Sequence, residues 1–408
     1  MLMRTLAAGV AATVMVSACS PADETEEAAT ISPGPDAYTA LQTALIEAQP
    51  GAVIELGAGT FNFTDGLSLD VDNVSIRGAS EGETILSFAG QEGAGEGLLI
   101  TSDNVVVSDL TMQDTKGDGI KSKGSNGITF RDLTVEWTRG PDPDNGAYGV
   151  YPVESQNVLV DNVTVRGASD AGIYVGQSNN IIVRNSLAEY NVAGIEIENS
   201  SNADVHDNVA TNNAGGILVF DLPNLPVMGG HSTRVFNNRI VDNNTPNFAP
   251  PGNIVANVPA GSGLMMMANQ NVHVFGNEFD KNQSAHILIY SYSYEFDDER
   301  YNPLPRDFVI RDNSYGEGGY DPKQRLAELS QLTGGTLPDI VWDGITSYPG
   351  GEADVRIVVD EPEDVGYVSL GLGSTPVDPS AAQVTNERQP VVEIAEPAPV
   401  VLPQDAAS

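Results

Sequence analysis

The chain has 408 residues, of which 40% are hydrophobic and only 6% are aromatic. Its 56 acidic and 19 basic side chains give a formal net charge of −37, which argues against nucleic acid or an anionic membrane surface as a general partner. This length suits two or three globular domains, although a protein of stacked repeats can reach it as one unit.

Residues 1–19 have the pattern of an export signal, because Arg4 precedes an apolar run that small residues follow. The end of this segment, Val16-Ser-Ala-Cys19, resembles the lipobox of bacterial lipoproteins, in which the cysteine becomes the lipidated N-terminus. Cys19 is the only cysteine, so we interpret it as a lipid attachment site; a plain secretory signal is the alternative. Ser20 stands where an inner-membrane retention signal would carry Asp, which favours a cell-envelope lipoprotein of the outer membrane that meets the membrane only through this anchor.

The two ends of the chain differ in composition from its centre. Residues 20–35 are acidic and rich in Ala, which predicts a tether. Residues 36–96 begin with helical spacing and continue with short β runs, which predicts an N-terminal cap and first coils. Residues 317–372 predict a C-terminal helix and capping strands. Residues 373–408, rich in Pro, Ala, Val and Glu without periodicity, predict a disordered tail.

Residues 97–316 repeat one unit. Gly149, Gly172 and Gly194, spaced by 23 and 22 residues, each precede an aliphatic residue, an outward residue and a second inward position. This period is typical of a solenoid. Each unit continues with an Asn-led turn, a second β run, an Asp or Asn corner and a short third run, so we predict a parallel β-helix of about ten coils. The leading slot is occupied in turn by Gly97, Gly119, Gly149, Gly172, Gly194, Gly216, Gly263 and His286.

Three insertions interrupt the period, at residues 139–147, at 222–231 together with 243–260, and at 291–306. Insertions in solenoids gather where partners bind. The first and part of the second precede a first strand and should flank its outer face. The third is either a lid or a packing loop, and the sequence favours neither.

Outward positions of the first strands carry the candidate site, because side chains alternate along a strand. In chain order these positions change from Lys121 through Tyr151 and Tyr174 to Glu196. The lysine is either a cationic site for a carboxylated sugar or a base, or it compensates nearby acidic groups. The tyrosines form either a platform for sugar rings or ordinary ladder packing.

Further carboxylates near this stripe could serve acid–base chemistry. Glu154, Asp170 and Glu196 are candidate acids or bases, and Lys123 is a second candidate anchor or base. Oxygen ligands of this kind also suit Ca²⁺, but no EF-hand or RTX-type spacing organises them. No HxH or HExxH spacing supports zinc. We therefore expect no cofactor and no metal, and Ca²⁺ is the alternative.

Several segments resemble a family of bacterial exported parallel β-helix repeat proteins within the pectate-lyase-like superfamily. Asp118-Gly-Ile-Lys121, Tyr148-Gly-Val-Tyr-Pro152 and Ala193-Gly-Ile-Glu-Ile-Glu-Asn199 carry this resemblance, which covers about half of the chain. It implies an all-β protein with a single right-handed parallel β-helix and an envelope location, without fixing a reaction.

The segment Tyr148-Gly-Val-Tyr-Pro-Val-Glu-Ser155 is more distantly similar to the active-site strand of mannuronan C5-epimerases, Tyr-Gly-Ile-Asp-Pro-His-Asp-Arg. Its Tyr, Gly and Pro agree, whereas Tyr151, Val153 and Glu154 replace Asp, His and Asp. The His–carboxylate pair of that motif is therefore absent, and abstraction of a C5 proton would need another base.

Two functions fit these observations. In the first, the chain is an enzyme that acts on a uronate-type polysaccharide by lyase or epimerase chemistry. The roles fall to Lys121 or Lys123 as anchor or base, to Tyr151 or Tyr174 as platform or proton donor, and to Glu154, Asp170 or Glu196 as acid and base. In the second, a non-catalytic envelope protein uses the same stripe to bind a glycan or a partner protein. Both share carbohydrate binding or processing.

Overall fold

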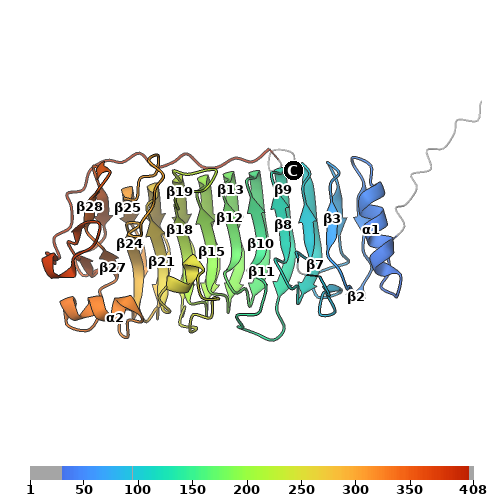
Figure 1. The fold of residues 1–408 in the computed structure, drawn as a ribbon, viewed down its shortest axis with the longest axis horizontal. Helices are drawn as coiled ribbons and strands as arrows, with labels where there is room; N and C mark the ends of the chain where they lie inside the picture. The colour runs from blue at the N-terminus through green and yellow to red at the C-terminus, as the bar shows by residue number, and fades with distance from the viewer. Residues whose placement is uncertain (1–29, 94, 404–408) are drawn as a thin grey trace, which may run out of the picture.

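The computed structural model describes residues 30–93 and 95–403. It is a parallel β-helix whose coils stack along one axis, with α1 (Ala37–Glu47) closing the N-terminal end (Figure 1). Leu41 and Leu45 of α1 are buried, so the helix covers the open core of the first coils. The proposed lipid attachment residue, Cys19, lies outside the described residues. Within the described part, no helix is long and apolar enough to cross a bilayer.

One face of the stack is an 11-stranded parallel sheet, which we call the first sheet. Its strands pair in chain order, one from each coil. They are β3 (Leu67–Leu69), β6 (Leu98–Ile100), β8 (Ile120–Lys123), β10 (Tyr148–Val153), β12 (Ala171–Gly176), β15 (Ala193–Glu198), β18 (Gly215–Phe220), β21 (Ser262–Met267), β24 (Ala285–Tyr290), β27 (Ile340–Trp342) and β31 (Tyr367–Ser369).

The rest of the wall is an 18-stranded sheet, which we call the second sheet. It contains the predicted second and third strands of the coils. They belong to one sheet because the long strands β7, β9 and β11 continue through the corner between them. Its strands are β1 (Val53–Glu55), β2 (Gly59–Asn62), β4 (Ser75–Arg77), β5 (Thr84–Ser87), β7 (Val105–Gln113), β9 (Asn126–Glu136), β11 (Gln156–Arg166), β13 (Asn179–Arg184), β14 (Leu187–Glu189), β16 (Ser201–His206), β17 (Val209–Thr211), β19 (His231–Phe236), β20 (Arg239–Val241), β22 (Gln270–Phe275), β23 (Glu278–Asp280), β25 (Arg306–Arg311), β26 (Ser314–Tyr315) and β30 (Ile357–Asp360).

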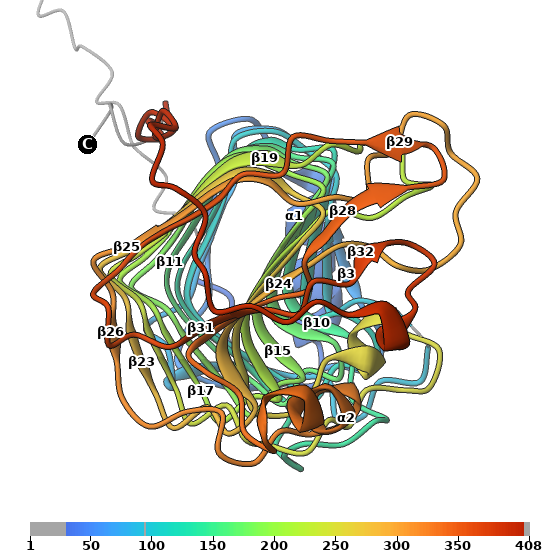
Figure 2. The ribbon, with the colours of Figure 1, turned by 90° about the vertical axis from the view of Figure 1, so that its left-hand side faces the viewer.

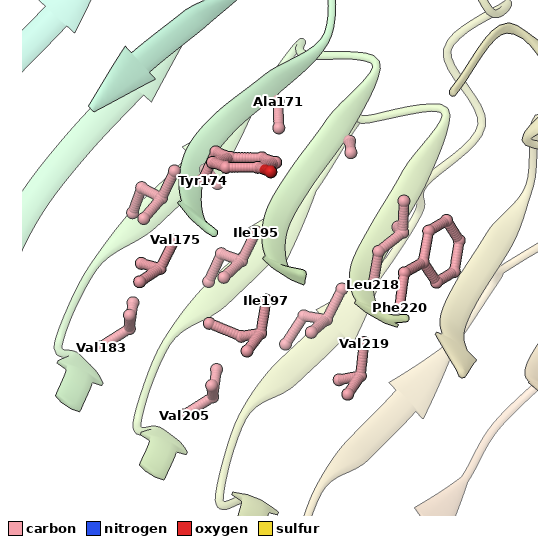
Figure 3. Close-up of a cluster of buried hydrophobic side chains, with 14 of the residues drawn as sticks. Ala171, Tyr174, Val175, Val183, Ile195, Ile197, Val205, Leu218, Val219 and Phe220 are labelled. Carbon is pink, nitrogen blue, oxygen red and sulfur yellow. The ribbon is translucent and has the colours of Figure 1, made fainter. Parts of the chain in front are cut away.

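The core consists of aliphatic rows that run along the stack. Val175, Ile197 and Val219 occupy equivalent positions on three successive coils and face Val183 and Val205 of the second sheet (Figure 3). All five side chains are fully buried. The sequence period is confirmed here, because each repeat places the same aliphatic position in the same row.

The leading glycines and the turn asparagines are structural. A Cβ atom on Gly172 would lie 2.9 Å from the carbonyl oxygen of Gly194 and 2.7 Å from Asn191, so only glycine fits between neighbouring coils there. Asn191, Asn213, Asn243 and Asn282 form a buried ladder in which each Nδ2 donates to the next Oδ1 at 3.0–3.1 Å. These bonds satisfy buried corner groups that water cannot reach.

The C-terminal end extends the solenoid. The C-terminal helix predicted within residues 317–372 is α2 (Arg325–Leu329), which is followed by a 3₁₀ turn, η2 (Ser330–Thr333). The strands β27, β30 and β31 continue the two solenoid sheets, so the coils run beyond residue 316. A small sheet of β28 (Ile345–Tyr348), β29 (Gly351–Glu352) and β32 (Gly373–Ser374) stands beside them. A further 3₁₀ turn, η3 (Pro379–Ala381), precedes the final segment.

The structure differs from the expectation of a disordered tail over 373–408. Residues 386–402, which we call the tail segment, lie along the stack back toward β9 (Figure 1). Glu396 accepts hydrogen bonds from Arg234 (3.1 Å) and Arg311 (2.8 Å). Leu402 is fully buried against Leu159 and Ile182. The tail has no periodicity of its own because an extended segment takes its contacts from the sheet beneath it.

Candidate functional site

Two rows of outward side chains lie on the first sheet, as alternation along its strands requires. One row runs from Lys121 through Tyr151 and Tyr174 to Glu196, on β8, β10, β12 and β15. A second row runs beside it, two residues further along each strand, and contains Glu198 of β15. The structure therefore brings four sequence-predicted residues together on consecutive coils.

Lys121 marks one edge of the site. Its Nζ lies 3.0 Å from Glu96 Oε1 and 3.6 Å from Asp118 Oδ2, and 4.8 Å from the centre of the Tyr151 ring. Burial raises the pKa of Asp118 to about 6, although the neighbouring lysine opposes this rise. The charge of Lys121 is thus largely compensated inside the protein, and its contact with the ring holds Tyr151 in place.

Three tyrosines form one cluster beside this lysine. The ring centres of Tyr148, Tyr151 and Tyr174 lie 4.4–4.9 Å apart in tilted and edge-to-face arrangements. Burial and nearby carboxylates raise the pKa of all three, to about 12 for Tyr151. Tyr148 and Tyr151 remain half-buried, so their rings can meet a ligand from outside, whereas Tyr174 is buried.

Three carboxyl groups follow the tyrosines on two neighbouring coils. Asp170 precedes β12, and Glu196 and Glu198 project from β15; their exposed fractions are 7%, 1% and 9%. Asp170 Oδ2 accepts a hydrogen bond of 3.2 Å from Asn253 Nδ2, and the nearby Tyr148 hydroxyl acts to lower the pKa of Asp170 against the effect of burial. Glu198 Oε1 accepts a hydrogen bond of 2.7 Å from the Tyr174 hydroxyl. Glu196 Oε2 is buried without a hydrogen-bond partner among the described residues.

Burial changes the titration of this cluster. It raises the pKa of Asp170 and of Glu198 to about 7, because water that would stabilise the anions is excluded. The pKa of Glu196 lies well above its usual range, through burial and through repulsion by Glu198 and Asp170. The cluster therefore remains partly protonated at neutral pH, and Glu196 is the group that holds its proton most strongly.

A cavity of about 410 Å³ opens over these groups. Tyr148, Asp170, Glu196 and Glu198 form its floor, and the loop after β18, the 3₁₀ turn η1 (Ile254–Asn257) and Tyr292 form its walls. Figure 2 looks along the stack and shows η1 (yellow) and α2 (orange) outside the first sheet. The insertions at 222–231, 243–260 and 291–306 thus shape the site. The third also packs inward, because the Tyr301 hydroxyl donates 2.5 Å to the Asp221 carbonyl.

Of the seven proposed residues, only Asp170 and Glu196 line this cavity. Tyr151 and Tyr174 contact its lining residue Tyr148 without lining it, and Lys121 lies beyond Tyr151. Lys123 and Glu154 are exposed and form an ion pair of 3.8 Å with each other at the end of β8 and β10. Glu154 has a φ of +53°, which places it in a turn after the strand. They line no wall of the 410 Å³ cavity.

Tyr148, Glu198, Asn253 and Tyr292 were absent from the predicted set. Glu198 follows from the same alternation as Glu196. The outward direction of Tyr148 does not follow from this alternation. A Cβ on Gly149 would point at Val165 in the core, so Gly149 and Val150 both face inward, and Tyr148 before them faces outward. Asn253 and Tyr292 come from insertions, where no periodicity assigns a direction.

Comparisons with known proteins agree with this architecture. Residues 65–227 match the family described as right handed beta helix region. No curated protein sequence matched the chain. Among solved structures, the chain is similar to the mannuronan C-5 epimerase AlgE4 A-module of Azotobacter vinelandii, at 16% identity over 85% of this chain and 96% of that chain, with a TM-score of 0.54. It is also similar to an alginate lyase from Paenibacillus sp. str. FPU-7, at 19% identity over 71% and 97%, with a TM-score of 0.45.

The fold and the site define the class of protein: a single right-handed parallel β-helix with a loop-walled cavity on the outer face of one sheet. Its coils between residues 65 and 227 carry the sequence pattern of the right-handed β-helix region. The identity to the epimerase module is low enough that the likeness shows a common fold and nothing more specific.

Proposed function

We propose that the chain binds a polysaccharide along the outer face of the first sheet and acts on it by acid–base chemistry, of the lyase or epimerase type on a uronate glycan. One observation carries this proposal: Asp170, Glu196 and Glu198 share one cavity in which burial raises their pKa. A carboxyl group with a pKa near 7 can both accept and release a proton at neutral pH, which acid–base catalysis requires.

Each group has a role that its surroundings favour. Glu196, which keeps its proton, would hydrogen-bond the sugar carboxylate through Oε2 and so stabilise its negative charge. Asp170 or Glu198, ionised, would take the C5 proton. In a lyase reaction the electron pair of that C–H bond forms the C4–C5 double bond, the C4–O bond breaks, and the leaving oxygen takes a proton from a tyrosine hydroxyl. The raised pKa of the tyrosines suits a donor rather than a tyrosinate base.

The comparisons support a glycan as the ligand class. The epimerase module with the same fold is named for mannuronan. The half-buried rings of Tyr148 and Tyr151 beside the cavity are surfaces on which a sugar ring can stack.

A non-catalytic glycan-binding role is the second candidate. It is favoured by the ion pairs of Lys121 with Glu96 and Asp118, because they engage the lysine that would otherwise bind a uronate carboxylate. In this case the cluster would only accept hydrogen bonds from sugar hydroxyl groups, and the envelope protein would act as a glycan or partner scaffold.

The experiment incubates the chain with alginate and pectin and follows three quantities: absorbance of unsaturated products, deuterium exchange at C5, and glycan binding by calorimetry. The double variant Asp170→Asn with Glu198→Gln, which removes both candidate bases, should abolish turnover, whereas the matched control Glu154→Gln, on a carboxylate outside the cavity, should retain it. Binding without either reaction would leave the binding role and refute the enzyme. Absence of binding and of both reactions would refute the whole proposal.

We also propose that Cys19 anchors the protein to the outer membrane through a lipid. The support is the Val16-Ser-Ala-Cys19 sequence. Replacing Cys19 with Ala should move the protein from the membrane fraction to the soluble fraction of the producing cell. An unchanged distribution would favour a plain secretory signal.

A further inference from the structure

The outer face of the first sheet changes character immediately beyond the carboxyl cluster. On the next coil, Leu218 takes the place of Glu196 and Phe220 that of Glu198. On the coil after that, Met265 and Met267 occupy the two positions. The carboxyl cluster therefore ends abruptly, and an apolar surface follows it in the same two rows.

A second cavity, of about 120 Å³, lies over this apolar surface. Phe220, Met265 and Met267 form its floor, while Leu326 of α2, Ile345 and Val377 close it from other parts of the chain. Methionine side chains adapt to ligands of irregular shape, because they are unbranched and polarizable. A cavity of about 150 Å³ with apolar walls can bind benzene, so this one has room for about four to five carbon atoms.

The two cavities are neighbours. Ile254 and Tyr292 line both of them, from opposite sides of a common wall. Met265 and Met267 stand two coils beyond Glu196 and Glu198, which at the spacing of paired strands is about 10 Å. A glycan held over the carboxyl cluster therefore reaches the apolar cavity with a substituent on the same or the next sugar unit.

The polar groups of this cavity indicate an uncharged ligand with an oxygen acceptor. Arg325 lines it, is exposed and makes no ion pair with another described residue. Asp343, also in the lining, is buried and accepts hydrogen bonds from the backbone of Ser291 (2.6 Å) and Ile345 (3.0 Å). The buried carboxyl group of Asp343 in the lining disfavours the carboxylate of a free fatty acid. An ester carbonyl is neutral and can accept from Arg325.

We propose that this cavity is a subsite for a short aliphatic acyl group, of about four to five carbon atoms, that the glycan carries as an ester. The inference rests on the proposed function and deepens it, since it assigns the substrate to acyl-substituted polysaccharides. The carbohydrate part lies over the carboxyl cluster, and the acyl chain replaces water against Met265 and Met267.

The first test uses pentan-1-ol as probe on the full chain labelled with ¹³C-methyl methionine. Pentan-1-ol should shift the methyl signals of Met265 and Met267 saturably and leave that of Met112, which is buried in an early coil, unchanged. Val377→Trp should fill the cavity and weaken binding at least tenfold. The matched control Val384→Trp, at an exposed position outside the lining, should not. Absence of a saturable shift, or an equal shift in Val377→Trp, overturns the subsite.

The second test compares pentyl and methyl β-D-glucoside. The pentyl compound should bind at least tenfold more tightly, and this preference should vanish in Val377→Trp; equal affinities in the natural chain overturn the acyl assignment. Because pentan-1-ol contains no sugar, the two proposals fail separately. Inactivity toward glycans with retained pentan-1-ol binding refutes the proposed function, whereas unresponsive methionines with retained glycan activity refute the subsite.

Discussion

The Tyr174 hydroxyl on β12 donates a hydrogen bond of 2.7 Å to Oε1 of Glu198 on the next coil, while Glu196, two residues earlier on the same strand, has a buried Oε2 without a partner in the described part of the chain. Two glutamates with the same outward orientation therefore have unequal surroundings. The hydrogen bond stabilises the anion of Glu198, and its absence favours the protonated form of Glu196. Such inequality lets neighbouring carboxyl groups take different roles.

Stability should fall as pH rises. Asp170, Glu196 and Glu198 have folded-state pKa values above those of the unfolded chain, so the native state binds more protons between about pH 4 and pH 7. Their contribution is fully present below the unfolded pKa and is lost as pH rises through about 7. The free energy of unfolding should decrease by at least about 2 kcal/mol from pH 5 to pH 8. Glu196→Gln should reduce this slope in denaturant titrations, whereas a slope unchanged from the natural chain would contradict the burial argument.

Removal of the Tyr174 hydroxyl should raise the pKa of Glu198. The hydrogen bond from Tyr174 lowers that pKa against the effect of burial, so Tyr174→Phe leaves burial unopposed. The measurement is an NMR titration of ¹³C-labelled glutamate carboxyl groups. Tyr151→Phe serves as control, because no hydrogen bond joins Tyr151 to Glu198. A downward or absent shift in Tyr174→Phe would show that the contact does not persist in solution.

Tyr151→Ala should weaken glycan binding. The half-buried Tyr151 ring packs against both other tyrosines at the edge of the cavity, and loss of a stacking ring costs about 1 kcal/mol, or roughly fivefold to tenfold in affinity. Tyr151→Phe should bind nearly as well as the natural chain. Tyr320→Ala, at an exposed tyrosine far along the stack, is the matched control for calorimetry. Equal losses in both alanine variants would argue against a platform at Tyr151.

Gly172→Ala should destabilise the solenoid by about 2 kcal/mol. The new methyl group would lie within 3 Å of backbone and of the Asn191 side chain, and neither can move without breaking the coil register. Gly34→Ala is the control, since a Cβ at Gly34 meets nothing within 4 Å. Thermal unfolding of the two variants should separate them clearly. A tolerant Gly172 would mean that neighbouring coils pack less tightly than the structure shows.

Leu402→Ala should lower stability by about 2 kcal/mol, because the side chain is fully buried on Leu159 and Ile182. Truncation before residue 386 should cost more, since it also leaves Arg234 beside Asp204 without its contact to Glu396. Leu332→Ala, at a 42% exposed leucine, provides the control. Protease digestion offers a second readout: an intact tail segment resists cleavage, and rapid loss of residues 386–402 from the natural chain would contradict the contacts.

The parts of this fold that depend on periodicity could be predicted from the sequence. Val150, Ile173 and Ile195 repeat every 22 to 23 residues, and that period predicted the coils, their register and the outward row from Lys121 to Glu196. Parallel pairing of equivalent positions leaves little freedom once the period is known.

The cavity depended on segments without a period. Asn253 and Tyr292 reach it from insertions, and Tyr148 faces outward because Gly149 and Val150 both face inward, which strict alternation does not describe. The tail segment was missed for a related reason. Its contacts join residues as far apart in sequence as Val400 and Asp204, and the composition of the tail segment does not indicate which distant residues it will contact.

The tail segment contacts the stack at two places that are several coils apart. Glu396 binds arginines on β19 and β25, and Leu402 rests on β11 and β13. From β25 to β11 there are five successive pairings, or about 24 Å at the spacing of paired strands. Solenoids tolerate the gain or loss of a coil because each repeat contacts only its neighbours. In this protein a duplicated or deleted coil between β11 and β25 would separate Leu402 from Leu159 and Ile182 while Glu396 stays with its arginines. The contacts of the tail segment therefore require a set number of coils between β11 and β25.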